Sequence, residues 1–551
     1  MLTTFRAAAF GLTLLIASPA QGLAAIVPSG GETQAILDQG RAAERAGRYA
    51  EARRIYRQGA EMGIPEAQYR LGLLYDDLAI GVAYDFPQAA NWYRKAVEKN
   101  HAAAMVSLGW LHARGQGMPA DSAEALYLFR RAADLGDPGG YSGMAYLYRT
   151  GSGVPKDEAK AEEWAAKAYP LWRRQAETGD PRAQHKLAAA LFEGRGVAKD
   201  ETAGLGWLSK AANQGYPLAT YDLATLYQSG VATVLSKDEA RARKLFGDGA
   251  ALGHHRSRYR LASMLAGGAG GPKDEVQARS VMLQAADQGL ADAQALAGAW
   301  LINGLGGPKD ETRGRAYLEL AAAQGNAAAR RNLASVLTAG LGGPKDPVRG
   351  RTLARQAAEA GDLPAHVRYG RYLAEGVGGP VDDAGARVWF EKAAKAGDAD
   401  AQVWLGVLLH DGRGGPADAA GAREWFRKSA EQGSAAGMFE YGKALTRGVG
   451  GPRNDRMAAE WFRKAADSGD DRALSWLGDL ANGGNADQPQ ARIWYGRAAE
   501  KGDNYARFHL GVMVFFGQGG PADQAKGLAL IRQAADGGHK PAKDWLAREG
   551  R

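Results

Sequence analysis

A glycine that recurs at a fixed spacing constrains the fold of this chain more than any other sequence feature. Each copy closes an Ala-Ala-x-x-Gly-like segment, and successive copies stand 36 residues apart, at Gly253, Gly289, Gly325, Gly361, Gly397, Gly433 and Gly469. Looser copies extend the series to Gly63 and to Gly538. A period of this length is typical of stacked structural repeats. The chain is therefore expected to form one repeat array, not the three or four globular domains that its length alone suggests.

A second position, nine residues after each recurring glycine, accepts only the two smallest residue types. It holds Gly or Ala in all thirteen copies, for example Gly370, Gly406 and Gly442. Apolar residues around this position keep helical spacing, as Leu405 and Leu408 do. We expect a helix here that lies close against another helix, because small side chains let two backbones approach.

A glycine-rich loop ends this first helix, with copies that read GLGGPKD at 304–310, GVGGPVD at 376–382 and GRGGPAD at 412–418. Glycine supplies the left-handed conformation at a helix end, and proline prevents continuation. The Asp of each loop is predicted to accept hydrogen bonds from the first N–H groups of a second helix, such as GAREWFRKSAEQG at 421–433. Each unit is thus helix, turn and helix. The predicted capping residues are Asp121, Asp157, Asp200, Asp274, Asp310, Asp346, Asp382, Asp418 and Asp523.

These units resemble the Sel-one-like repeat (SLR) family, which is related to the tetratricopeptide repeats. The resemblance rests on AQVWLGVLLHDGRGGPADAAGAREWFRKSAEQG at 401–433 and its copies, and it covers about residues 40–545. It implies an all-α fold, a right-handed α/α superhelical solenoid of about fourteen helix-turn-helix repeats. It also implies a concave surface that binds other proteins. Family members include bacterial envelope adaptors that support or regulate exopolysaccharide production and export.

The two ends of the chain differ from the repeats. Residues 1–24 join one arginine to a short apolar run, which predicts a cleaved signal peptide and not a membrane span. Small residues allow cleavage after Ala20 or after Ala24. Residues 25–39 are expected to form an N-terminal segment before the repeats, and residues 546–551 a polar tail after them.

One repeat contains a longer second helix, with Trp164, Tyr169, Pro170 and Trp172 in its extension. Proline lacks the amide hydrogen that a helix interior needs, so Pro170 is predicted to bend or divide this helix. The extension is interpreted either as a tolerated insertion or as a functional bulge on one face of the array.

Composition and motifs argue against catalysis and cofactors. The chain has no cysteine, which excludes disulfides, thiolate metal sites and catalytic thiols. Its glycine loops lack the GxxxxGKS or GxxxxGKT pattern of a phosphate-binding loop, and the zinc motif HExxH is absent. We therefore expect no enzyme activity, no cofactor and no bound metal. The net charge of +8 is spread evenly along the chain, which argues against a nucleic-acid partner.

One cluster of basic residues interrupts this even distribution. It comprises His254, His255, Arg256, Arg258 and Arg260, at the start of a first helix. The helix dipole disfavours positive charge at this end, so the cluster is electrostatically unfavourable unless negatively charged groups lie close to it. Two interpretations stay open: a solvated face or one paired with neighbouring acids, and a binding site for an anionic partner.

The expected function is that of a periplasmic, non-enzymatic scaffold or adaptor that binds envelope proteins through its concave surface. The resemblance extends this expectation to the support or regulation of exopolysaccharide biosynthesis or export. The alternative is a direct binder of anionic polysaccharide or peptidoglycan, which requires aromatic and basic side chains in the groove. Trp389, Trp425 and Trp461 instead recur at expected core positions. No membrane span is expected in the mature chain, which is exported and at most peripheral to the envelope.

Export predicts a defined N-terminus for the mature protein. N-terminal sequencing of the protein recovered from the cell envelope is expected to find Gln21 or Ala25 as the first residue, because cleavage follows Ala20 or Ala24. Intact residues 1–24 on a protein recovered from the cytoplasm would contradict the export signal.

Overall fold

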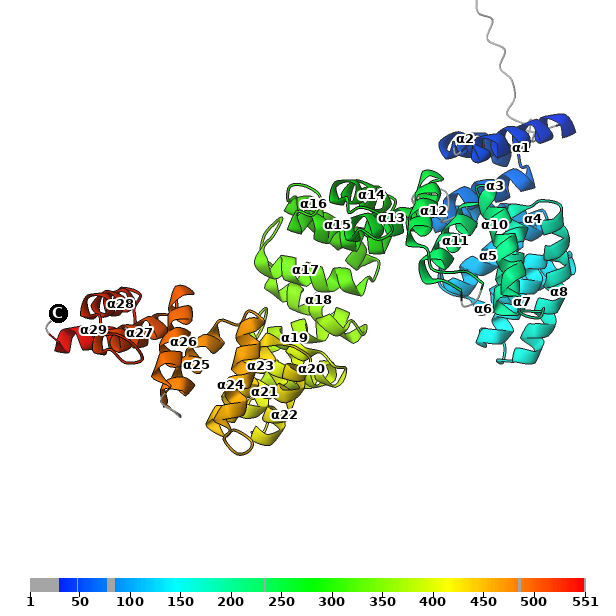
Figure 1. The fold of residues 1–551 in the computed structure, drawn as a ribbon. Helices are drawn as coiled ribbons and strands as arrows, with labels where there is room; N and C mark the ends of the chain where they lie inside the picture. Colours follow the sequence, from blue (N-terminus) through cyan, green and yellow to red (C-terminus); the bar gives the residue numbers. More distant parts are fainter. Residues whose placement is uncertain (1–28, 47, 77–84, 232–233, 484–486, 550–551) are drawn as a thin grey trace, which may run out of the picture. The chain divides into compact units, whose positions relative to one another are not determined.

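The structure, a computed structural model, describes residues 29–46, 48–76, 85–231, 234–483 and 487–549. These ranges contain twenty-nine α-helices and no strand, apart from an isolated bridge between Val231 and Leu235. Figure 1 shows the helices in chain order. Their bounds are α1 Gly30–Arg45, α2 Tyr49–Glu61, α3 Pro65–Asp76, α4 Phe86–Glu98, α5 Ala102–Arg114, α6 Ser122–Asp134, α7 Pro138–Thr150, α8 Glu158–Glu177, α9 Pro181–Glu193, α10 Glu201–Asn213, α11 Pro217–Ser229, α12 Glu239–Ala251, α13 His255–Gly267, α14 Glu275–Asp287, α15 Ala291–Asn303, α16 Glu311–Ala323, α17 Ala327–Ala339, α18 Pro347–Glu359, α19 Leu363–Glu375, α20 Asp383–Lys395, α21 Ala399–Asp411, α22 Ala419–Glu431, α23 Ala435–Arg447, α24 Asp455–Asp467, α25 Arg472–Gly483, α26 Gln488–Glu500, α27 Asn504–Phe516, α28 Gln524–Asp536 and α29 Lys540–Arg548.

The helices pack as consecutive pairs, from α1 with α2 to α27 with α28, and α29 follows as a single helix. This arrangement confirms the predicted α/α solenoid of about fourteen helix-turn-helix units. In each pair from α3 onward, the first helix carries the Gly or Ala position, and the second follows the loop aspartate except in α24, where Asn454 takes its place. Tandem repeats of this kind contact mainly their neighbours, and successive pairs contact each other from α2 and α3 to α12 and α13, and again from α16 and α17 to α26 and α27.

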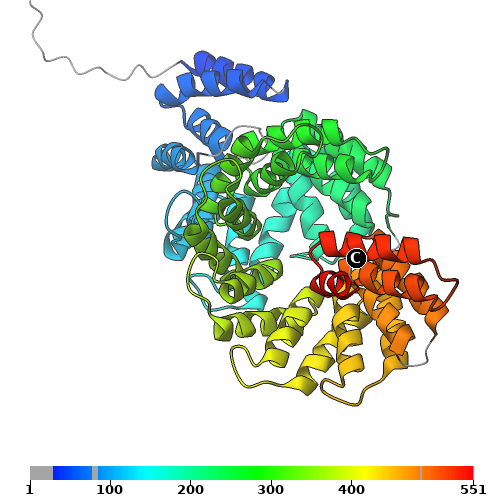
Figure 2. The same cartoon turned by 90° about the vertical axis from the view of Figure 1, so that its left-hand side faces the viewer.

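The chain forms two compact units, unit 1 (Met1–Gly289) and unit 2 (Leu290–Arg551). Within unit 2, successive helix pairs lie side by side in chain order (Figure 2). Unit 1 curls back on itself. A contact between distant residues shows this: the Tyr49 hydroxyl donates to the carbonyl of Leu252 at 3.3 Å. Leu218 on α11 also packs against the apolar cluster that contains Leu71 of α3. The first helices of unit 1 are therefore wrapped around a common interior.

The predicted helix caps are confirmed. The carboxylate of Asp418 accepts a hydrogen bond from the N–H of Gly421 at 2.8 Å and so caps α22. Gly412 ends α21 in the left-handed region with φ 67°, a conformation that glycine adopts without steric cost. The capping bond is present for Asp121, Asp157, Asp200, Asp274, Asp310, Asp346, Asp382, Asp418 and Asp523.

The predicted close approach at the Gly or Ala position is also confirmed, and its cause is an aromatic ring. A Cβ added to Gly406 would lie 2.5 Å from Cε1 of Phe426, whose ring from the second helix lies over the glycine. The same contact joins Gly72 to Tyr93, Gly109 to Phe129, Gly370 to Phe390, Gly442 to Phe462 and Gly478 to Tyr495. In these six pairs the small residue makes room for a buried ring, whereas Gly298 and Gly511 face Leu318 and Ile531 instead.

Arginines on the second helices connect neighbouring repeats in a way that the repeat pattern did not predict. Nη1 of Arg351 on α18 donates to the carbonyl of Pro380, in the loop after α19, at 2.8 Å. The guanidinium lies beside Gly379, where a Cβ would come within 2.7 Å of Nη1. The same bond joins Arg243 to Pro272, Arg315 to Pro344, Arg387 to Pro416, Arg423 to Pro452 and Arg492 to Pro521. Each of these six Gly-Gly-Pro loops is thereby held by the preceding repeat.

Other expectations about the ends and the long helix need correction or lie outside the described residues. The predicted signal peptide, residues 1–24, is outside them. The helical array starts at Gly30, so the boundary predicted at residue 40 falls inside α1, where Ser29 forms a capping box with Glu32. At the C-terminus, α29 extends to Arg548, into the segment expected to be a tail.

The long second helix is not divided by its proline. α8 runs without interruption from Glu158 to Glu177, with Pro170 inside it. Of the two predicted outcomes, division is therefore wrong, and a bend at Pro170 stays a prediction. Among the helices that the structure describes, none combines the length and the apolar character needed to cross a membrane.

The ring contact in each pair predicts opposite effects of the same substitution at two helical glycines. Gly406→Ala forces its Cβ against Phe426, and overpacking of this kind is expected to lower the free energy of unfolding by about 1–3 kcal/mol. Gly496→Ala is the matched control, because a Cβ there meets nothing within 4 Å and the helix gains about 0.5–1 kcal/mol. Chemical denaturation followed by circular dichroism measures both effects, and equal stabilisation by the two substitutions would refute the close packing.

Candidate functional site

The interior of unit 1 contains a cavity of about 490 Å³. Its wall comes mainly from the first helices of four successive pairs, α3, α5, α7 and α9, and from the C-terminal end of α8. The lining residues are Glu66, Tyr69, Arg70, Leu73, Ala103, Val106, Ser107, Trp110, Asp137, Pro138, Gly139, Ser142, Trp172, Gln175, Asp180, Arg182, Lys186 and Tyr216. Volume and lining are typical of a ligand or partner site, which combines aromatic walls with a few oriented polar groups.

The curl of unit 1 closes this cavity. Nη1 of Arg182 on α9 donates to the hydroxyl of Tyr69 on α3 at 3.3 Å, although the two residues are 113 positions apart. Burial is the main reason that the pKa of Tyr69 is raised, so its hydroxyl stays protonated at neutral pH. Two repeats that are distant in sequence therefore share one wall.

Glu66 is the most strongly held acid of the cavity. Its carboxylate lies 2.9 Å from Nε2 of His101 and accepts from Nε of Arg70 at 2.8 Å. Because Nδ1 of His101 accepts from the N–H of Ala104, Nε2 is the donor toward Glu66. Burial alone would raise the pKa of Glu66, but the His101 hydrogen bond and the Arg70 charge outweigh it and lower the pKa to about 2.

The other two acids of the cavity are helix caps. Asp137 accepts from the N–H of Gly139 at 2.7 Å, and burial raises the pKa of its carboxyl. Asp180 accepts from the N–H groups of Arg182 and Ala183 at 2.8 and 3.2 Å. Each lining carboxylate is thus engaged by the protein.

Two tryptophans form the apolar part of the wall. The indole of Trp172 on α8 donates from Nε1 to the Ser142 hydroxyl at 3.0 Å, which fixes the orientation of the ring. The ring of Trp110 on α5 meets the ring of Tyr146 edge to face at 4.8 Å. Trp172 belongs to the extension of the long second helix, so that extension contributes directly to the cavity. The sequence analysis did not identify Tyr69, Trp110 and Arg182 as site residues. Each of them stands three, six, seven or ten residues after the recurring position of its repeat.

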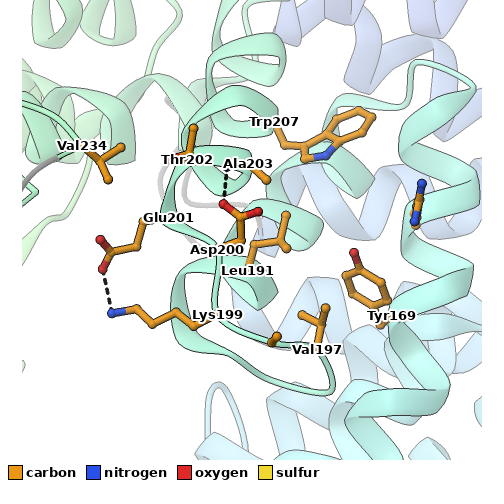
Figure 3. Close-up of a pocket in the computed structure, with 12 residues that line it drawn as sticks. Tyr169, Leu191, Val197, Lys199, Asp200, Glu201, Thr202, Ala203, Trp207 and Val234 are labelled. Atoms are coloured by element: carbon orange, nitrogen blue, oxygen red, sulfur yellow. Dashed lines mark hydrogen bonds and ion pairs between the residues drawn. The ribbon is translucent and has the colours of Figure 1, made fainter.

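A larger hollow of about 800 Å³ lies between α8, the loop before α10 and Val234 (Figure 3). Its polar groups serve the repeat turn. The Asp200 carboxylate accepts from the N–H of Ala203 at 2.9 Å, and Nζ of Lys199 pairs with Glu201 at 2.6 Å. Volume alone therefore does not make it the better candidate, because its charges are engaged in capping and local ion pairs.

The basic cluster predicted as a partner site is split by burial. His254 and His255 are buried, with 0% and 2% of their surface exposed. Nδ1 of His254 accepts from the N–H of Ser257 and so caps α13. Arg256 and Arg260 are exposed, whereas Arg258 is half-buried. Whether the cluster binds a partner stays a prediction.

Three half-buried tryptophans of unit 2 recur at one position of the second helices. Trp389, Trp425 and Trp461 pack against the apolar core of their repeats. The ammonium of a lysine three residues later covers each ring at 4.2–4.4 Å. Their recurrence at core positions agrees with the sequence-based expectation.

The Glu66 network predicts an acid-dependent loosening of α3. Since folding lowers the pKa of Glu66 from 4.5 to about 2, its contribution to stability is complete above pH 4.5 and is lost as the pH falls toward 2. Glu66→Gln is expected to cost on the order of 2–3 kcal/mol at neutral pH and to flatten this pH dependence. Hydrogen exchange of α3 and α5 measures the effect. Glu98→Gln, at an exposed position of α4, is the control, and an equal response of the two variants would contradict the network.

Comparison with known proteins gives two kinds of match. The model of the Sel1 repeat matches thirteen times, at residues 65–101, 102–137, 139–169, 181–216, 217–254, 255–290, 291–326, 327–362, 363–398, 399–434, 435–470, 472–503 and 504–539. A search of curated proteins found no match.

Two solved structures are similar to this chain. One is a protective antigen present in uropathogenic Escherichia coli strains, which displays an SLR fold. It is 27% identical with a TM-score of 0.58, and the alignment covers 83% of this chain and 97% of that chain. The other is a Sel1 repeat protein from Oxalobacter formigenes, 30% identical with a TM-score of 0.45, for which the shares are 56% and 89%. Since the matched repeats follow one another through most of residues 65–539, the chain belongs to the Sel1 repeat family.

Proposed function

We propose that this protein is an exported, non-enzymatic scaffold that binds a protein partner in the cavity of unit 1. A tandem Sel1-repeat solenoid is a framework suited to protein–protein interaction. The observation that carries the proposal is the convergence of Tyr69, Trp110, Trp172 and Arg182 from separate repeats on one cavity. Tyrosine, tryptophan and arginine are the residues that contribute most to binding at protein interfaces.

The proposed location is the periplasm, and the proposed partner is a protein of the cell envelope. The support is the signal-like pattern of residues 1–24, together with the resemblance to envelope adaptors. In its finer form, the proposal is that the scaffold supports or regulates exopolysaccharide biosynthesis or export. This finer form rests on that resemblance alone.

The alternative is direct binding of an anionic polysaccharide or of peptidoglycan. A specific observation supports it: the cavity holds both aromatic rings, Trp110 and Trp172, and cationic groups, Arg182 and Lys186. The protein partner is favoured because the cavity also contains engaged carboxylates such as Glu66. Fixed negative charges beside the cations would repel a uniformly anionic chain.

Site-specific crosslinking in living cells tests the proposal. A photoreactive amino acid placed at Ser107 in the cavity is expected to capture an envelope protein, identified by mass spectrometry. The same amino acid at Arg130, exposed on the second helix α6, is the matched control and should not capture that protein. Adducts that contain carbohydrate only would establish the alternative, and equal capture at both positions would refute the cavity as the binding site. Unchanged exopolysaccharide in a deletion strain would refute the finer form.

A further inference from the structure

Two exposed arginines on α13, Arg256 and Arg260, occupy repeat positions that line the cavity in earlier repeats. We define the lining positions as those three, six, seven and ten residues after the recurring glycine. In the repeat of Gly179, positions three and seven are Arg182 and Lys186, and both line the cavity. Arg256 and Arg260 hold positions three and seven after Gly253. Residues four apart share one face of a helix, so these arginines continue the inner surface of unit 1 beyond the cavity.

Arg258 does not belong to this surface. It holds position five, where other repeats place a buried glutamine that donates to a carbonyl of the preceding helix. Gln184 donates to Ala176 and Gln402 to Ala394, each at 3.2 Å. Burial lowers the pKa of the half-buried Arg258. The arginine cluster therefore divides into one scaffold residue and two surface residues.

The charges of Arg256 and Arg260 are not compensated in the way that those of four other lining cations are. Arg70 pairs with Glu66 at 2.8 Å, Arg331 with Asp362 at 3.1 Å, Arg371 with Glu375 at 3.2 Å and Lys443 with Glu440 at 2.7 Å. Within the part of the chain that the structure describes, no carboxylate lies within 4 Å of the guanidinium nitrogens of Arg256 or Arg260. This cationic pair would therefore gain from an anionic partner.

The surroundings of the pair add positive potential. Arg256 lies in the first turn of α13, where the helix dipole disfavours a cation. Burial, and then the neighbouring arginines, lower the pKa of His254 to about 3 and that of His255 to about 4. Both imidazoles are neutral at physiological pH, so they neither add charge nor supply compensation. The potential at the start of α13 comes from the arginines and the helix end.

The same surface carries a further cation two repeats earlier. Lys186 on α9 is exposed and lines the cavity. Among the first helices of the pairs, α11 lies between α9 and α13 in the chain, and it carries Asp222. The carboxylate of Asp222 lies 2.7 Å from Nε2 of His185. The cations thus flank an acid that already has a partner.

From this arrangement we infer that Arg256 and Arg260, together with Lys186, bind an extended segment of the partner protein rich in aspartate or glutamate. The inference rests on the proposed function and names the chemistry of the partner. Arginine pairs with carboxylates through two parallel hydrogen bonds. Neighbouring helices pack about 8–10 Å apart, so two repeats span roughly 16–20 Å. An extended chain covers about 3.3–3.6 Å per residue, so two acidic groups about five or six residues apart reach both sets of cations.

Peptide binding to the mature chain tests this inference. The probe is a fluorescent peptide with two aspartate pairs separated by four neutral residues, and anisotropy measures its affinity. Arg256→Ser with Arg260→Ser is expected to weaken binding at least about tenfold, with an unchanged circular dichroism spectrum. Arg241→Ser with Lys244→Ser is the matched control, because it removes the same charge from exposed positions of the second helix α12. Equal losses in both double variants, or none in the first, would overturn the inference.

Three further measurements separate the remaining explanations. Arg256→Glu with Arg260→Glu is expected to abolish binding of the acidic peptide and to create binding of a lysine-containing peptide of the same spacing. Lys186→Ser should weaken the spaced peptide and leave one with four contiguous aspartates unaffected; equal effects would refute the role of Lys186. Competition by polygalacturonate with tighter binding than the peptide would assign the arginines to polysaccharide instead. Crosslinking at Ser107 is independent of these peptides, so a captured protein with no peptide binding refutes only the acidic chemistry.

Discussion

The fold of this protein depends on one packing contact, an aromatic ring laid over a residue with little or no side chain. In the pair α21 and α22, the ring of Phe426 occupies the space that a Cβ on Gly406 would need. The contact sets how closely the two helices approach, and it recurs from Tyr93 to Tyr495. Because a solenoid has no long-range core, each repeat depends on its own pair contact and on its neighbours. A substitution there disturbs the local stack instead of a single global core.

The loops between the helices mostly serve this stack. Asp418 satisfies the first N–H groups of α22, and Arg387 from the preceding repeat holds the carbonyl of Pro416 in the same loop at 3.1 Å. The glycine before the proline leaves space for the guanidinium, since a Cβ on Gly415 would lie 2.7 Å from Nη1. Capping and inter-repeat contact thus occupy the most regular part of the sequence. The residues at the lining positions of the first helices are not needed for capping or for contact between repeats, and they vary from repeat to repeat.

Function is best sought where this variation accumulates. In unit 1 the lining positions bring together Tyr69, Trp110 and Arg182 around a cavity, and they continue to Arg256 and Arg260 on α13. The acids of the cavity are engaged by backbone amides, His101 and Arg70. The lining also carries aromatic and cationic side chains. This division between a uniform framework and a variable inner surface is what a binding scaffold requires.

The sequence by itself determined the repeat period, the helix pairs, the aspartate caps and the small residue under each ring. These features are local, since a cap acts across two or three residues and the rest recur with the period. Only the tertiary structure decided that Tyr69 meets Arg182 across 113 positions and that Trp172 faces the cavity. These contacts depend on the small rotation between successive repeats, added over several pairs. The total rotation over several repeats is not specified by any one repeat, so the repeat pattern of the sequence does not predict these contacts.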